Sequence, residues 1–324
     1  MAPCEALAKI DARSGGQQAG GMDAVSPLRS KPASSLAPPE TSEPPFVLVE
    51  PLRRKSPLLL ASPHSGRRYP RALLDHAKAS MQALRRAEDA YVDALFAQAP
   101  QAGAPLLCAT VARAYVDLNR DPTELDPAMF EGCLAPLPLR LKSPRVQAGL
   151  GVIPRLAGDG GEIYGAKLCA SEAGRRLNAV HAPYHAALSA QMEENFALFG
   201  CAVLLDCHSM PSCARGPFAP DVVLGDRFGA AADPEVISRT EQALKRLGYK
   251  VARNTPFAGG YGAEQYGRPA RNWHALQIEL SRGLYLNERT LEPNGAFDQV
   301  RRDMHRLVEC LVEAKLEKRL CKAR

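Results

Sequence analysis

The sequence contains no apolar run near the ~18 residues that a membrane-spanning helix needs, so no membrane partner is expected. Its first ten residues, MAPCEALAKI, lack the apolar stretch of a signal peptide, and secretion is not expected either. The nine cysteines are an odd number for 324 residues, which argues against a disulfide framework. From these absences, a cytoplasmic location is the simplest expectation.

Motifs that cradle phosphate are also missing, because the chain has neither GxxxxGK[ST] nor GxGxxG after an apolar run. The net charge of +6 is concentrated in residues 301–324, where eight basic and four acidic residues contribute +4. That segment has no aromatic residue, whereas nucleic-acid surfaces interleave aromatic with basic residues. We therefore interpret it as a solvated helix face and expect no nucleic-acid partner.

Residues 1–45 differ from the rest, because they are rich in Ala, Pro, Ser and Gly and show no helical or strand periodicity. We expect a disordered leader there, since such a segment buries too little apolar surface to offset its ordering entropy. From Phe46 onward, short apolar runs alternate with helical patterns, which predicts one α/β domain over residues 46–324, with a mixed, largely parallel sheet flanked by helices. The predicted strands are 46–50, 57–64, 106–118, 201–208, 221–225, 249–253 and 275–281. The predicted helices are 83–98, 171–199, 233–247 and a C-terminal helix through 304–312, with Pro183 expected to kink the second or to begin a helix.

Two histidines lie where buried strands emerge into loops. His64 follows the apolar run PLLLASP, and His208 ends CAVLLDC. Ligands in α/β sheets bind beyond the carboxyl ends of strands, and neutral imidazole is a common metal ligand. One such histidine alone more often closes a strand by a hydrogen bond, but the pair indicates half of a zinc site. Because side chains alternate along a strand, Asp206 shares a face with His208, whereas Cys207 points away.

Three other groups of polar residues are candidates for a site. Glu279 lies on the polar face of the strand 275–281, which fits either a half-solvated strand or a general base. The segment from Arg113 to Pro122 holds two arginines and an asparagine, and arginine forks match carboxylates, so it indicates an anion site rather than a surface ion-pair cluster. The loop 259–262, GGYG, is either a plain turn or a mobile lid that presents Tyr261.

Taken in order, the motifs of residues 45–290 resemble the N-formylglutamate amidohydrolase family. The matching strings are SPHSG (62–66), DLNRDP (117–122), GLGVIPR (149–155), GEIY (161–164), DCHSMPS (206–212), VLGDR (223–227), GGY…YGRP (259–269) and HALQIELSR (274–282). Each string is weak alone, but eight in sequence are specific. The resemblance implies a zinc-carboxypeptidase-like fold, one zinc ion, and cleavage of the formyl group from N-formyl-L-glutamate, a small anionic substrate, in histidine degradation.

The same resemblance implies roles for individual residues. It makes His64 and His208 zinc ligands and Glu279 the base. It places Asn119 and Arg120, with Arg113 nearby, on a substrate carboxylate. Tyr261 resembles a mobile tyrosine that assists the transition state.

The third zinc ligand departs from the pattern of the wider superfamily. There a glutamate follows the first histidine by three residues, but this chain has Arg67 at that position. The family's acidic motif on the next helix is similar to Glu88–Asp93 here, so the resemblance implies Asp89 as the third ligand, in preference to Asp93 one helical turn further on.

Other functions stay open at this point. A hydrolase with Ser65 or Cys207 as nucleophile is disfavoured, because neither residue lies in a GxSxG elbow and Cys207 points away from His208. A non-enzymatic binding protein would have no need of His64, His208 and Glu279 together. A deacylase or carboxypeptidase-like enzyme for another N-acyl amino acid is the closest rival, since the sequence does not measure the size of the pocket. The oligomeric state stays open.

Overall fold

Seven strands form the central sheet of the computed structural model, which describes residues 43–140, 142–212 and 219–321. The order across the sheet is β1-β3-β2-β6-β9-β7-β8. The strands are β1 (Phe46–Val49), β2 (Leu58–Ser62), β3 (Leu106–Ala109), β6 (Ala202–Met210), β7 (Val222–Gly225), β8 (Val251–Arg253) and β9 (Trp273–Ser281). The predicted leader, residues 1–45, lies outside the described residues except for its last three.

The sheet is mixed and largely parallel, as predicted. Strands β3, β2, β6 and β9 run parallel to one another, β1 pairs antiparallel with β3, and β7 pairs antiparallel with β9. All seven predicted strands are present, but the run 106–118 gives a strand only as far as Ala109. Pairing with β1 ends at Ala109, so the rest of that run has no continuous partner and forms turns instead.

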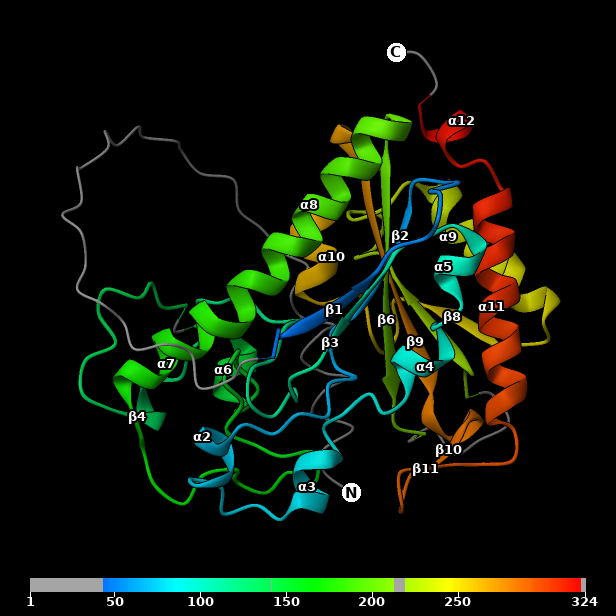
Figure 1. Cartoon of the computed structure of the whole chain (residues 1–324). Helices are drawn as coiled ribbons and strands as arrows, with labels where there is room; N and C mark the ends of the chain where they lie inside the picture. Colours follow the sequence, from blue (N-terminus) through cyan, green and yellow to red (C-terminus); the bar gives the residue numbers. More distant parts are fainter. Residues whose placement is uncertain (1–42, 141, 213–218, 322–324) are drawn as a thin grey trace, which may run out of the picture.

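Helices cover both faces of the sheet (Figure 1). On one face lie α7 (Ala170–Arg176), a π-helical turn (Leu177–His181) and α8 (Ala182–Phe199), so a helix begins beside Pro183 as predicted. The other face carries α4 (Val92–Leu95), α5 (Ala99–Ala102), α9 (Pro234–Arg246) and α11 (Phe297–Glu313). Alternate residues of β2 point into the two cores, with Leu58 and Leu60 on the α11 side and Leu59 and Ala61 on the α8 side. Burial on both faces explains why these strands are nearly continuous apolar runs.

The single helix predicted over 83–98 is wrong, and the error bears on the site. The segment forms α3 (Met81–Arg85) and α4, separated by a turn in which Tyr91 adopts the left-handed region at φ +65°. Such a backbone conformation interrupts a right-handed helix. Asp89 therefore lies on the turn and Asp93 on α4, so the two carboxylates do not share one helical face.

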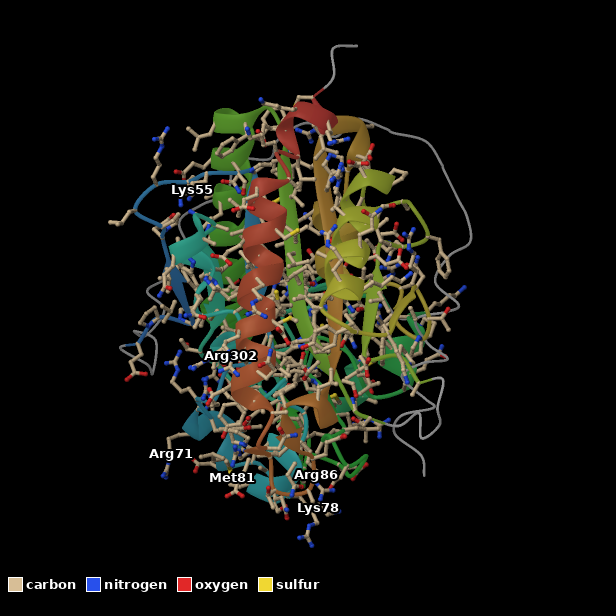
Figure 2. The ribbon with its side chains drawn as sticks, turned by 90° about the vertical axis from the view of Figure 1, so that its right-hand side faces the viewer. Lys55, Arg71, Lys78, Met81, Arg86 and Arg302 are labelled. Atoms are coloured by element: carbon tan, nitrogen blue, oxygen red, sulfur yellow. The ribbon has the colours of Figure 1, made fainter. Side chains whose placement is uncertain are left out.

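The C-terminal helix α11 has one apolar and one charged face. Met304, Leu307, Val308 and Leu311 are buried against the sheet, whereas Figure 2 shows Arg302 on the outward face. Helix formation with this amphipathic pattern confirms the predicted C-terminal helix. Among the described residues 43–140, 142–212 and 219–321, no helix has both the length and the apolar character to cross a membrane.

Short elements complete the chain between these layers. They are α2 (Arg71–Leu74), α6 (Pro144–Gln147), α10 (Tyr261–Tyr266), α12 (Glu317–Leu320), the 3-10 turns Pro127–Met129, Pro269–Arg271 and Arg282–Leu284, and the strand pairs β4 (Phe130–Glu131) with β5 (Leu168–Cys169) and β10 (Leu286–Asn287) with β11 (Glu292–Pro293). Helix α10 packs on β9 and carries the predicted Tyr261 at its first position.

Candidate metal centre and active site

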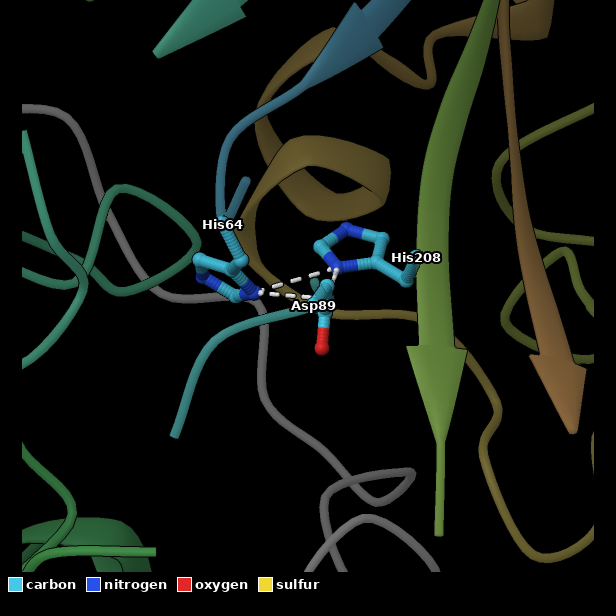
Figure 3. A group of neighbouring side chains, drawn as sticks. All are labelled: His64, Asp89 and His208. Atoms are coloured by element: carbon cyan, nitrogen blue, oxygen red, sulfur yellow. Dashed lines mark hydrogen bonds and ion pairs between the residues drawn. The ribbon is translucent and has the colours of Figure 1, made fainter. Parts of the chain in front are cut away.

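Three side chains from distant parts of the chain meet at one end of the sheet (Figure 3). The Nδ1 atom of His208 lies 3.1 Å from Nδ1 of His64 and 3.0 Å from Oδ2 of Asp89, and His64 Nδ1 lies 3.3 Å from the same oxygen. All three residues are buried, with at most 2% of each residue exposed. The structure thus brings together the three residues that the sequence analysis assigned to a metal, and it places Asp93 elsewhere, in an ion pair with Arg67.

The spacing of these atoms fits a shared metal ion. Ligand bonds of ~2.0–2.1 Å at tetrahedral angles put neighbouring donor atoms about 3.3 Å apart. Two imidazole nitrogens that face each other at 3.1 Å repel through their lone pairs unless a proton or a cation lies between them. Two imidazoles and one carboxylate are a ligand set suited to zinc and other divalent transition metals.

The local fold fixes each of the three residues. His64 follows β2 directly, and His208 lies within β6, the neighbouring parallel strand. The backbone N–H of Asp89 donates to the carbonyl of His64 at 3.0 Å, which ties the turn before α4 to the end of β2. The left-handed residue Tyr91 then directs the chain away into α4.

Carboxylates behind the two histidines set which ring nitrogen is free. His64 Nε2 donates to Asp117 Oδ1 at 2.7 Å, and His208 Nε2 lies 3.1 Å from Oδ2 of Asp206. Because a carboxylate only accepts, Nε2 of His64 carries the proton and its Nδ1 offers its lone pair to a metal, and the carboxylate of Asp206 favours the same arrangement in His208. The predicted shared face of Asp206 and His208 is confirmed by this contact.

The other oxygen of Asp89 is held by Arg282. The Nη2 atom of Arg282 donates to Asp89 Oδ1 at 2.9 Å, and its Nε donates to Ser209 Oγ at 3.1 Å. This contact leaves Oδ2 of Asp89 to face the histidines. Sequence reasoning missed Arg282 because the two partners are 193 positions apart, although the arginine directly follows β9 at the edge where the site was expected.

The charges around the cluster favour a cation in its centre. Burial raises the pKa of Asp89, but hydrogen bonds and charges of His208 and His64 outweigh it and hold that pKa well below its usual range. Burial lowers the pKa of His208, but the carboxylates of Asp206 and Asp89 raise it well above its usual value. A site that draws a proton onto a buried histidine in this way offers the same attraction to a metal ion.

Glu279 lies beside the cluster on the adjacent strand. In the parallel pair β6–β9, Glu279 is directly opposite His208. Its side chain is buried, with 7% of the residue exposed, and Oε1 accepts a hydrogen bond from Gln277 Nε2 at 2.8 Å. Pairing in this register points both side chains to the same face of the sheet, so the carboxylate of Glu279 borders the metal-ligand cluster.

The three residues predicted to bind a substrate carboxylate lie around Asp117. Arg113 Nε donates to Asp117 Oδ2 at 2.8 Å, and 21% of the Arg113 side chain is exposed. Arg120 is more buried and donates to the backbone carbonyls of Leu150 and Asn119. Burial raises the pKa of Asp117, but Arg113 and Arg120 hold it well below its usual range.

Both amide atoms of Asn119 have partners within the protein. Its Oδ1 accepts from the N–H of Gly262 at 2.8 Å, and its Nδ2 donates to Gln277 Oε1 at 3.2 Å and lies 3.2 Å from His208 Nε2. A Cβ at Gly260 would lie 2.4 Å from Asn119 Nδ2, and one at Gly262 would lie 2.5 Å from a carboxylate oxygen of Asp206. The glycines of the GGYG segment are therefore required by close packing behind the site.

Tyr261 begins α10, and its ring contacts the rings of His181 and His185 at centroid distances of 5.8 and 5.1 Å. Burial, with smaller contributions from Asp121 and Glu264, raises the pKa of Tyr261 to about 12. The hydroxyl therefore stays protonated near neutral pH and is a hydrogen-bond donor.

The rival nucleophiles lack an activating base. Ser65 Oγ exchanges hydrogen bonds with Ser62, and Cys207 is fully buried and donates to the carbonyl of Leu205. Burial raises the pKa of Cys207 well above its usual value, so its thiolate is disfavoured. Although each is next to a histidine in the sequence, the Ser65 hydroxyl bonds Ser62 and the Cys207 thiol bonds a backbone carbonyl, not the histidine partner that activates a nucleophile.

The sequence of this chain is similar to the sequences of known proteins. A sequence model of the N-formylglutamate amidohydrolase family matches residues 56–286. A protein named N-formylglutamate deformylase from Pseudomonas aeruginosa is 32% identical over 246 residues, which cover 73% of this chain and 84% of that protein. One of the same name from Pseudomonas putida is 30% identical over 238 residues, covering 72% and 82%.

Solved structures give the same relationship. The crystal structure of N-formylglutamate amidohydrolase from Ralstonia eutropha JMP134 has 38% sequence identity and a TM-score of 0.79, and the match covers 85% of this chain and 99% of that one. A gene product from Agrobacterium tumefaciens, 17% identical with a TM-score of 0.55, shares the fold over 84% of this chain and 97% of its own.

Proposed function

This chain belongs to the N-formylglutamate amidohydrolase family, and from that premise we propose that it hydrolyses N-formyl-L-glutamate to formate and L-glutamate with one zinc ion. The observation that carries the proposal is the buried cluster of His64, Asp89 and His208 with Glu279 on the adjacent strand. The expected place in histidine degradation and the cytoplasmic location belong to the same proposal.

His64, Asp89 and His208 would hold the zinc ion, because their donor atoms converge at separations that suit it. When bound, zinc polarises the formyl oxygen and lowers the pKa of water towards 7. General acid–base catalysis alone contributes ~10²–10⁴-fold, less than the ~10⁶-fold typical of enzymes, so a second source of stabilisation is needed. Asp117, Asp206 and Arg282 keep the three donor atoms oriented before any ion binds.

Glu279 is proposed as the group that moves the proton. Its carboxylate accepts a proton from the water that attacks the formyl carbon, and it then delivers this proton to the glutamate nitrogen as the C–N bond breaks. The products are formate and the free amino acid. Gln277 Nε2 donates to Oε1 of Glu279, which holds the carboxylate in place.

Substrate orientation is assigned to Arg113, Asn119 and Arg120. The partly exposed Arg113 is assigned the direct contact with a substrate carboxylate. Asn119 and Arg120 lie beside it around Asp117. Tyr261 donates a hydrogen bond during the reaction, since its hydroxyl stays protonated. Binding energy gained at the carboxylates, away from the reacting carbon, orients the formyl group.

Two substitutions separate these roles. Arg113→Ala is expected to raise KM by about tenfold or more, because a charge-assisted hydrogen bond contributes about 1.5–3 kcal/mol.

Tyr261→Phe is expected to lower kcat and to leave KM nearly unchanged. Steady-state kinetics and zinc content measure both effects. An unchanged KM in Arg113→Ala, or an unchanged kcat in Tyr261→Phe, would remove that residue from its role.

The choice of substrate is tested with a panel of N-formyl-, N-acetyl- and N-succinyl-L-glutamate and N-formyl derivatives of uncharged amino acids. We expect the highest kcat/KM for N-formyl-L-glutamate and loss of activity after dialysis against a chelator, with recovery on adding zinc. Greater activity on a larger acyl group would favour a deacylase for another N-acyl amino acid. Full activity in the zinc-free protein would reject metal-dependent hydrolysis.

A further inference from the structure

Two further histidines hold the polypeptide on which the site is built. His181 Nε2 donates to the carbonyl of Arg120 at 2.9 Å, and His185 Nε2 donates to the carbonyl of Leu118 at 2.9 Å. The carbonyls on either side of Asn119 are thus both fixed from helix α8 and the π-helical turn before it.

This segment depends on outside donors because it is not part of a strand. Residues 118–120 form a turn after β3 has ended, and Leu118, Asn119 and Arg120 are each at most 6% exposed. Buried carbonyls that lack strand partners need other hydrogen-bond donors. Neutral imidazole is a rigid donor, and two residues four apart in a helix lie on one face about 6 Å apart along the axis. His181 and His185 have this spacing.

The structure around the histidines keeps them neutral and rigid. Burial lowers the pKa of His181, and burial with the nearby His181 lowers the pKa of His185 to about 3. The two rings are in contact at a centroid distance of 4.3 Å. Because Nε2 of the neutral His185 ring donates to the Leu118 carbonyl, Nδ1 is left as an acceptor, and Tyr266 Oη, on α10, lies 2.9 Å from it.

The turn that His181 and His185 hold is joined to the metal ligand His64. One residue before Leu118, Asp117 accepts a hydrogen bond from His64 Nε2. Asp117 also accepts from the N–H of Asn119 at 2.9 Å, which makes the turn one rigid unit. A shift of this turn would release the orientation of the His64 imidazole.

From these contacts we infer that His181 and His185 are positioning residues that act on the metal centre through the turn 117–120. The inference rests on the proposed metal-dependent function and adds two residues whose ring nitrogens bond the carbonyls of the turn. The π-helical turn at Leu177–His181, followed by Pro183 in the first turn of α8, is the local feature that delivers them, and such turns are frequent at functional sites.

The test measures zinc affinity of the whole chain, without substrate, by competition with a chromophoric chelator. His181→Leu and His185→Leu are expected to weaken zinc binding by about tenfold, the lower end of the 10–100-fold loss seen when partners of metal ligands are changed. His181→Gln and His185→Gln keep a donor near the position of Nε2 and are expected to restore affinity to within about threefold. Asp117→Asn, which alters the partner of His64 itself, sets the scale of a full effect.

A matched control separates positioning from general stability. His274 is as buried as His181 and accepts from the backbone N–H of Asp233, at the opposite end of β9 from Glu279. His274→Leu is expected to lower the melting temperature as much as the other leucine variants do, without changing zinc affinity. If a leucine variant does not fold, His181→Asn, whose amide is too short to reach the Arg120 carbonyl, is compared with His181→Gln.

Unchanged zinc affinity in the folded His181 and His185 variants would overturn the inference while leaving the proposed function intact. Failure of the unmodified protein to bind zinc would overturn the metal centre and this inference together. A drop in affinity that glutamine restores, with no drop in His274→Leu, supports positioning through the turn. Because substrate is absent, this result does not depend on which N-acyl amino acid the enzyme cleaves.

Discussion

Glu279→Gln is expected to lower kcat by about 10²–10⁴-fold while the protein keeps its zinc, because the amide has the size of the carboxylate but accepts no proton. The side chain is buried opposite His208 and already receives a hydrogen bond from Gln277, so a neutral replacement finds a compatible neighbour and the fold is retained. Steady-state kinetics on N-formyl-L-glutamate and elemental analysis of the same preparation measure the two properties separately.

An exposed glutamate provides the control for this substitution. Glu292 lies on β11 at the surface, and Glu292→Gln removes the same charge without touching the site. We expect it to keep both activity and zinc. Wild-type turnover in Glu279→Gln would exclude Glu279 as the base, and loss of zinc together with activity would show that its charge supports metal binding instead.

The positions of His64 and His208 were predictable because each histidine follows or ends an apolar run with the pattern of a strand. An apolar run that ends in a histidine gives the strand, its edge and the face of the side chain, as it does for His64 and for Asp206 with His208. The parallel order of β2, β6 and β9 then brings these positions to one edge of the sheet. The local sequence pattern is sufficient to predict the positions of His64 and His208, since parallel pairing of the strands brings the two side chains together.

Asp89 is different, because helical periodicity predicted its surroundings incorrectly. An unbroken helix over 83–98 would put Asp89 and Asp93 on nearly the same face, and the choice between them would have little physical basis. The left-handed Tyr91 breaks that helix, and no residue type there announces the break, since tyrosine rarely adopts such a conformation. The choice of Asp89 came from family resemblance, and its contacts with Arg282 depend on tertiary structure that no local pattern encodes.

The same two aspartates provide the most discriminating test of the metal centre. Asp89→Asn is expected to weaken zinc binding by more than about 100-fold and to abolish measurable activity at limiting zinc, since replacing a ligand should cost more than the 10–100-fold loss from altering its neighbours. The amide oxygen of the new residue remains available to Arg282, which spares that buried cation the cost of losing its partner. The amide nitrogen then faces His64 and His208, where it offers no lone pair to a metal.

Asp93→Asn is the matched control, because it makes the same chemical change four residues away. Its carboxylate pairs with the half-exposed Arg67, and such surface pairs contribute only about 0–1 kcal/mol to stability. We expect wild-type zinc affinity and activity in this variant, measured by chelator competition and steady-state kinetics. The reverse result, zinc lost from Asp93→Asn and kept in Asp89→Asn, would mean that the turn before α4 rearranges when the metal binds and that Asp93 is the third ligand. Equal affinity in both variants would leave His64 and His208 without an acidic partner among these two residues and would reject the three-residue centre.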